Sequence, residues 1–174
     1  MNDLLRFVLH HIEDEWDRLL HEFVQFTPET FTWQPDPNVH SIGWHVRHTI
    51  EWRYALVHVM IGRQPNQEQL YCLGWETDPV VKKLVANPGV WYEPRFTVSD
   101  NVQFADRVRN LTNSEIASLP PARFSEEMDF PWKAKSRVLD EIAEELRHSA
   151  LHRGHVQELK KLYARRGQSL VGSR

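Results

Sequence analysis

Three histidines stand close together near the C-terminal end of the chain, in the segment RHSALHRGHV. His148, His152 and His155 are spaced four and then three residues apart. In a helix, which turns by about 100° per residue, they fall within roughly 60° of arc. Neutral imidazole is a ligand of zinc and similar metals, and two histidines at positions i and i+4 can close on one ion. His148 and His152 are therefore predicted metal ligands, and a packed structural histidine cluster is the alternative that spacing alone leaves open.

A third ligand has to come from another helix, and His48 is the best-placed candidate. It lies in the segment SIGWHVRHTIEW, with Trp44 and Trp52 one helical turn on either side. Catalytic zinc sites usually use three protein ligands and keep one position open. His45, one turn before His48, and His155 could each join as a ligand or support one, or do neither.

Few acidic residues accompany these histidines. Glu51 and Glu145 lie on or near the histidine faces of their predicted helices. Either carboxylate could hold an imidazole N–H or act as a base toward water on the metal. A plain salt bridge is the alternative for Glu145. Arg153 could pair with an acidic residue, bind a substrate anion or simply be solvated. The lone Cys72 permits no disulfide within the chain.

Four amphipathic segments must position these side chains. Apolar residues recur at helical spacing over residues 2–26, 41–62, 99–119 and 136–167. Ser41, Ser99 and Ser136 are the predicted N-caps, and Gly167 is the predicted stop of the last helix. No sheet is expected beside them. The pattern predicts an all-α helical bundle.

The connections are irregular, and prolines divide them. Residues 27–40 hold three prolines and are predicted to be a loop. Residues 63–97 form a long aromatic connection, in which Pro79–Ala86 is a predicted short helix. This connection is expected either to wall a substrate pocket or to pack over one end of the bundle. Residues 122–135 are expected to include a short extended segment.

Length and composition narrow the class of protein. The 174 residues are predicted to form one domain, residues 1–174, with 41% hydrophobic and 26% charged residues. The net charge of −3 gives no reason to expect nucleic-acid or membrane binding. There is no apolar run long enough to span a bilayer and no signal-peptide pattern. A cytoplasmic location is expected.

Two short motifs and one tripeptide make the chain resemble the DinB-like superfamily of four-helix bundles. SIGWHVRH is similar to the segment leading to that family's first metal histidine, and HSALHRGHV is similar to its second histidine motif. Phe130-Pro131-Trp132 also resembles the family. The resemblance implies a four-helix bundle that binds one divalent metal ion through His48, His148 and His152. Zinc is the first choice of metal, and nickel, iron or manganese are alternatives.

The resemblance also sets the expectation for function. Members of the superfamily include thiol transferases, and metal-dependent hydrolysis has been proposed for others, so a small-molecule substrate or thiol is expected. The resemblance also implies a homodimer. One departure is His155, where the family often has Gln. A non-catalytic, stress-related binding protein with a structural metal or none, and a degenerate site of merely packed histidines, are the alternatives. Gly154, inside the last helix, is expected to mark a close approach of two helices beside the site.

Overall fold

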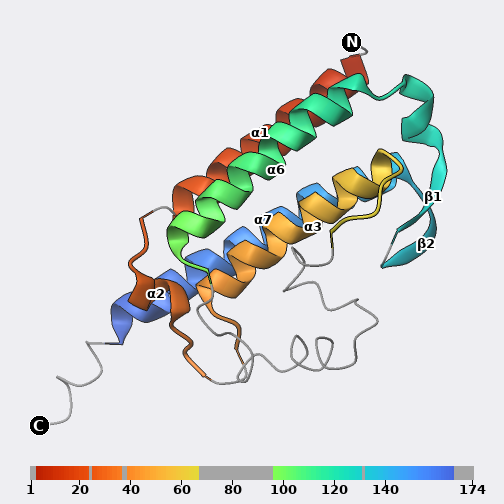
Figure 1. Cartoon of the computed structure of the whole chain (residues 1–174). Helices are drawn as coiled ribbons and strands as arrows, with labels where there is room; N and C mark the ends of the chain where they lie inside the picture. Colours follow the sequence, from red (N-terminus) through yellow and green to blue (C-terminus); the bar gives the residue numbers. More distant parts are fainter. Residues whose placement is uncertain (1–2, 24, 37–38, 67–95, 131, 167–174) are drawn as a thin grey trace, which may run out of the picture.

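Four long helices make up most of the computed structural model, which describes residues 3–23, 25–36, 39–66, 96–130 and 132–166 (Figure 1). Helix α3 runs antiparallel to α7, and α1 packs mainly against α7 whereas α6 packs mainly against α3. Their bounds are α1 Asp3–Phe23, α3 Ile42–Met60, α6 Val98–Ser118 and α7 Val138–Arg165. This confirms the predicted all-α bundle.

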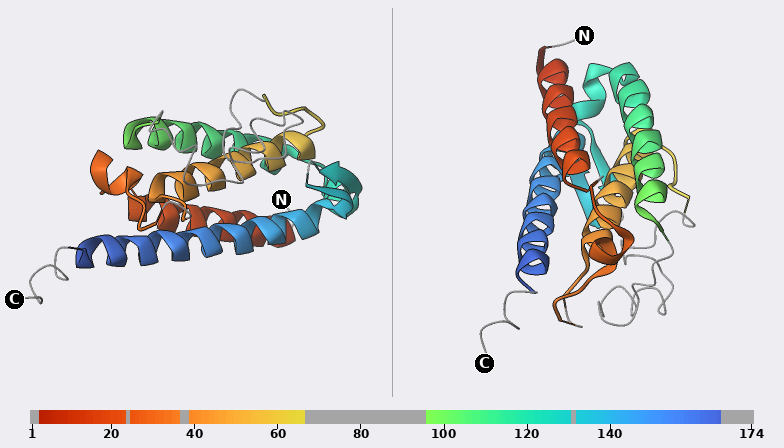
Figure 2. Two further views of the ribbon diagram at one scale, coloured as in Figure 1. Left: turned by 90° about the horizontal axis from the view of Figure 1, so that it is seen from below. Right: turned by 90° about the vertical axis from the view of Figure 1, so that its left-hand side faces the viewer.

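Helices α3 and α7 form the central contact of the bundle. Helix α7 packs against both α1 and α3, and α3 packs against both α7 and α6 (Figure 2). Almost the whole circumference of α3 is buried, including its charged residues. A helix apolar or buried all round belongs in the interior of a fold. No helix in the described part of the chain is both long and apolar enough to cross a bilayer.

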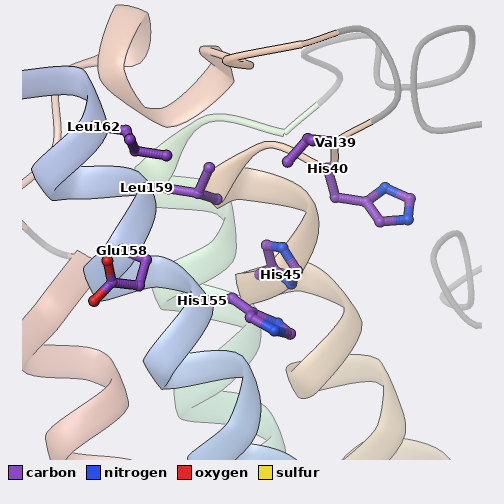
Figure 3. A pocket seen from close by; sticks show the side chains of 7 residues that line it. All are labelled: Val39, His40, His45, His155, Glu158, Leu159 and Leu162. Atoms are coloured by element: carbon purple, nitrogen blue, oxygen red, sulfur yellow. The ribbon is translucent and has the colours of Figure 1, made fainter. Parts of the chain in front are cut away.

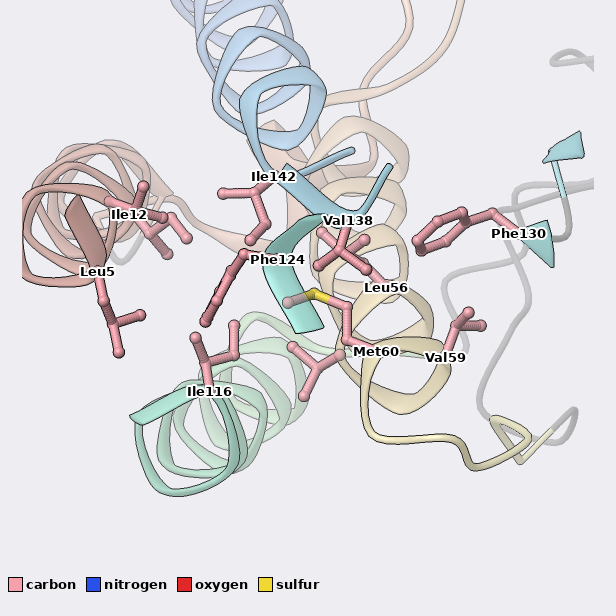
Figure 4. Close-up of a cluster of buried hydrophobic side chains, with 12 residues drawn as sticks. Leu5, Ile12, Leu56, Val59, Met60, Ile116, Phe124, Phe130, Val138 and Ile142 are labelled. Atoms are coloured by element: carbon pink, nitrogen blue, oxygen red, sulfur yellow. The ribbon is translucent and has the colours of Figure 1, made fainter. Parts of the chain in front are cut away.

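Two apolar clusters fill the space between the helices. One gathers at the end of the bundle near the start of α7, where Phe124 and Ile116 meet Ile142 (Figure 4). The other surrounds Trp16, Phe23 and Phe31, all of which are fully buried. Of the apolar residues at helical spacing on the first helix, Leu9 is partly buried and the others are buried, namely Leu5, Ile12, Trp16, Leu19 and Phe23.

Of the three predicted N-cap residues, Ser41 is confirmed, whereas Ser99 and Ser136 are wrong. Ser41 is the N-cap of α3, and its Oγ accepts the amide N–H of Trp44 at 3.1 Å. Helix α6 begins at Thr97 rather than at Ser99, because Thr97 and Asp100 form a reciprocal capping box. Ser136 does not cap the last helix. It is buried in a strand, and α7 begins after Arg137.

Two short elements were not expected from the sequence. Residues Pro28–Thr32 form the helix α2 inside the predicted loop, since Thr27 caps it and Pro28 occupies its first turn, where a missing N–H costs nothing. The last connection, beyond the 3₁₀ turn η2 (Pro121–Ser125), is a hairpin. Its antiparallel strands are β1 (Glu127–Phe130) and β2 (Lys133–Arg137). The expectation of an extended segment there is confirmed, but the absence of any sheet is not.

Part of the predicted organisation lies outside the described residues. This holds for the helix expected at Pro79–Ala86, for Cys72, for the stop at Gly167 and for most of the aromatic connection.

Gly154 does not mark a close helix approach. A Cβ built on this residue would meet no atom within 4 Å beyond its own helix and chain neighbours, so the expected steric reason for glycine is wrong. Gly62, just after α3, has equal space but a φ of +73°, a conformation that suits glycine.

These two glycines give a matched pair of substitutions. Gly154→Ala should raise the free energy of unfolding by about 1 kcal/mol, because alanine loses less backbone entropy in a helix. Gly62→Ala should lower it by about 1 kcal/mol, because its backbone is left-handed. Urea unfolding followed by circular dichroism measures both. A destabilised Gly154→Ala protein would contradict the open space found here.

Candidate metal centre

The three predicted ligands come together between α3 and α7. Nε2 of His148 lies 3.0 Å from Nε2 of His48, which is 100 residues away in the sequence. It also lies 3.0 Å from Nε2 of His152, one helical turn further along α7. One nitrogen from each ring lies within 4.8 Å of the others. Two imidazole nitrogens bound to one tetrahedral zinc stand about 3.3 Å apart. This Nε2 triad therefore fits a divalent metal ion after displacements of a few tenths of an ångström.

Tryptophan rings hold two of these imidazoles in place. Trp44 stacks on His48 with ring centroids 4.5 Å apart, and Trp52 stacks on His148 at 4.2 Å. Behind Trp52 lies Trp132, whose indole N–H donates a 2.6 Å hydrogen bond to Glu141. The tryptophans thus restrict ring rotation and exclude water from one side of the triad.

Burial keeps the imidazoles of His148 and His152 neutral, which is the form that binds a metal. It lowers the pKa of His148 to about 3, and the neighbouring His48 lowers it further. It also lowers the pKa of His152, whose side chain is only 7% exposed. A low pKa leaves a ring nitrogen lone pair free at neutral pH. Both the geometry and the donor chemistry of the triad suit a borderline divalent ion.

His45 and His155 lie near the ring of His152, on the side away from the Nε2 triad. Nδ1 of His152 is 2.8 Å from Nδ1 of His45, so His45 approaches the nitrogen that the Nε2 triad does not use. His155 lies near both, with its ring centroid 4.8 Å from that of His45. Neither side chain completes the coordination of the Nε2 triad.

The two carboxylates with predicted catalytic roles lie in buried ion pairs. Glu145 accepts hydrogen bonds from Arg53 Nε at 2.8 Å and from Ser149 at 2.9 Å. Glu51 accepts one from Arg47 Nε at 2.5 Å, and both side chains are buried. The alternative of a salt bridge for Glu145 is what the structure has.

Arg153 links helices rather than projecting into open solvent. Its Nε donates a 2.6 Å hydrogen bond to Glu15 on α1. Of the possibilities considered for this residue, namely an ion pair, a substrate anion and solvation, the structure has the pairing with an acidic residue.

His40 is a neighbour of the site that the sequence analysis missed. Its ring stacks on Trp44 at 3.5 Å, so Trp44 lies between His40 and His48. Burial lowers the pKa of His40 to about 4. His40 lies four residues before Trp44, and this spacing could have indicated the contact between the two rings. The predicted helix starts at Ser41, so a pattern confined to that helix does not include His40.

A family comparison agrees with this geometry. The model of the DinB superfamily matches residues 11–156, which include all three residues of the Nε2 triad. The chain belongs to the DinB superfamily. No curated protein matches it. Family membership and, within the part of the chain that the structure describes, two histidine groups that could hold a metal ion are thus both established.

Acidification should destabilise the metal-free protein through its buried neutral histidines. A group whose pKa is lowered on folding stabilises the fold above its unfolded pKa, about 6.5, and that stability is lost as the pH falls toward the folded value. For His40, the loss between pH 7.5 and pH 5 should be about 1–2 kcal/mol. Urea unfolding in EDTA at both pH values measures it. His40→Gln should show a correspondingly smaller pH effect, and an unchanged effect would refute the depressed pKa.

Removing one partner of the Arg53–Glu145 pair should cost far more than removing a surface pair. Both side chains are 1% exposed, so Arg53→Met leaves a buried charge unpaired and should lower the free energy of unfolding by about 3–5 kcal/mol. The control is Arg147→Met, since Arg147 pairs with Glu144 at the surface of α7 and should cost less than about 1 kcal/mol. Equal losses would show that Glu145 does not depend on Arg53. Arg53→Met combined with Glu145→Leu should recover much of the loss.

Proposed function

We propose that the protein binds one divalent metal ion through His48, His148 and His152 and is a metal-dependent enzyme. The observation that carries this is the convergence of three Nε2 atoms from two helices, two pairs of them 3.0 Å apart. Zinc is the first choice of metal, with nickel, iron and manganese as alternatives, because neutral imidazole suits all of these to different degrees.

The ion would supply Lewis acidity, lowering the pKa of a bound water or thiol toward neutrality. The residues around it have separate tasks. His48, His148 and His152 hold it, and Trp44 and Trp52 orient two of those rings. Glu145 pairs with Arg53 between α3 and α7, and Glu51 pairs with Arg47 within α3, so we propose a structural rather than a proton-transfer role for both carboxylates.

Among the described residues, the group of His48, His148 and His152 has no fourth member, and this favours an enzyme over a structural metal protein. A closed site would need a fourth protein ligand, and His45 and His155 were the candidates for it. Both lie beyond the Nδ1 side of His152, away from the Nε2 triad. This supports activation of water or a low-molecular-weight thiol, and so a hydrolase or thiol S-transferase acting on a small molecule. A homodimer stays a prediction.

Metal content of substituted proteins tests the ligand set. His48→Ala and His148→Ala should each lose zinc affinity by at least tenfold, because each removes one of three ligands. The matched control is His21→Ala, an exposed histidine on α1, which should bind as the wild type does. Affinity is measured by competition with a chromophoric chelator, and circular dichroism checks the fold.

Unchanged affinity in folded His48→Ala and His148→Ala proteins would refute the assignment. With the ligands established, thiol-transfer and hydrolysis assays on the zinc- and nickel-loaded wild type decide between the two reactions. Loss of the same activity in both variants would tie it to the ion.

A further inference from the structure

A second group of three imidazoles lies beside the Nε2 triad. His45 from α3 and His152 and His155 from α7 each offer a ring nitrogen, and these atoms lie within 4.8 Å of one another. His152 belongs to both groups, with different atoms. Its Nε2 lies 3.0 Å from His148, whereas its Nδ1 lies 2.8 Å from His45. One ring thus stands between two sets of donors.

Two members of the second group, His45 and His155, open onto a cavity. His45 and His155 line a cavity of about 370 Å³ together with His40, Glu158 and three aliphatic side chains, Val39, Leu159 and Leu162. Figure 3 shows the rings of His45 and His155 next to each other on its wall. His48, His148 and His152 are not part of the described lining. An ion held by the second group would therefore face a space large enough for water or a small ligand.

The cavity lining includes an acidic residue. Glu158 is one of the lining residues, and the 2.6 Å hydrogen bond from Lys161 lowers the pKa of its carboxyl, which is therefore ionised at neutral pH and paired with that ammonium. Among the described residues that line the cavity, none is a lysine or an arginine. Three neutral imidazoles form a donor set that divalent zinc, copper and nickel prefer.

We propose that His45, His152 and His155 form a second site for a divalent transition metal, open to the cavity and joined to the Nε2 triad through His152. A neutral imidazole has one lone pair, so it can bind one ion. When both sites are filled, the remaining ring N–H proton of His152 passes to buffer, and the resulting imidazolate binds one ion through each nitrogen. The protein then holds a pair of ions bridged by a single side chain.

Zinc titrations of four proteins test this second site. The wild type should bind two ions per chain, and His155→Ala should bind one. His48→Ala combined with His148→Ala, which removes the Nε2 triad and keeps His152, should also bind one. His21→Ala, an exposed control on α1, should bind two. Calorimetry in buffers of different ionisation enthalpy should show one additional proton released with the second ion.

The outcomes separate this site from the one under "Proposed function". The second site is established if the double variant retains one ion and loses it when His155→Ala is added. If His155→Ala alone bound no metal, that result would refute the Nε2 triad but would leave the second site established. A double variant that is folded by circular dichroism but binds no zinc would overturn the second site. If that variant is unfolded, His48→Gln alone, which should keep one ion sensitive to His155→Ala, takes its place. One ion per chain in the wild type would overturn the bridge.

Discussion

The buried ion pair between Arg53 and Glu145 fixes how α3 and α7 lie against each other, and the histidines depend on that contact. Arg53 lies five residues after His48, and Glu145 lies three residues before His148. The guanidinium also donates to the carbonyl oxygen of Ile12 at 3.3 Å and lies over the ring of Trp16, both on α1. One side chain thus ties three helices together within about one turn of the imidazoles. A sliding of α3 along α7 would separate these buried charges at high cost.

Around this contact, burial and aromatic stacking give the imidazoles their chemistry. A histidine at a helix surface rotates freely and titrates near neutrality. Here Trp52 and Trp132 cover His148 on one side, and Trp44 lies between His40 and His48. Burial in this aromatic surrounding is what lowers the pKa of His148 and His40. The same residues that exclude water therefore prepare ring nitrogens to bind a metal.

Features that depend on residues close together in the sequence could be predicted, whereas contacts between distant segments could not be predicted from spacing alone. Helices followed from their apolar period, and the pair His148–His152 followed from a spacing within one helix. That His48 faces this pair is a contact between distant segments. The position of His48 between Trp44 and Trp52 made it a candidate, and the family resemblance made it the predicted ligand. The role of Glu145 depended on Arg53, which is 92 residues away and carries no local signal.

The local errors have equally physical causes. Both Thr97 and Ser99 can cap a helix, and the capping box with Asp100 decided for Thr97. Ser136 was read as a cap because a hydroxyl preceded an apolar period, but pairing with Met128 across the hairpin keeps it in β2. In residues 27–40 the prolines indicated a loop, although a proline in the first turn is compatible with a helix.

The position of His152 explains why the two histidine groups cannot be considered separately. Its ring presents one nitrogen to His148 and the other to His45, so a rotation that improves one contact weakens the other. His45 lies on α3 and His148 on α7, so the two partners of the ring belong to the two helices that pack most closely against each other. The bundle thus turns an ordinary spacing of histidines along α7 into a shared centre, in which whatever binds on one side of His152 sets the protonation and direction of the other.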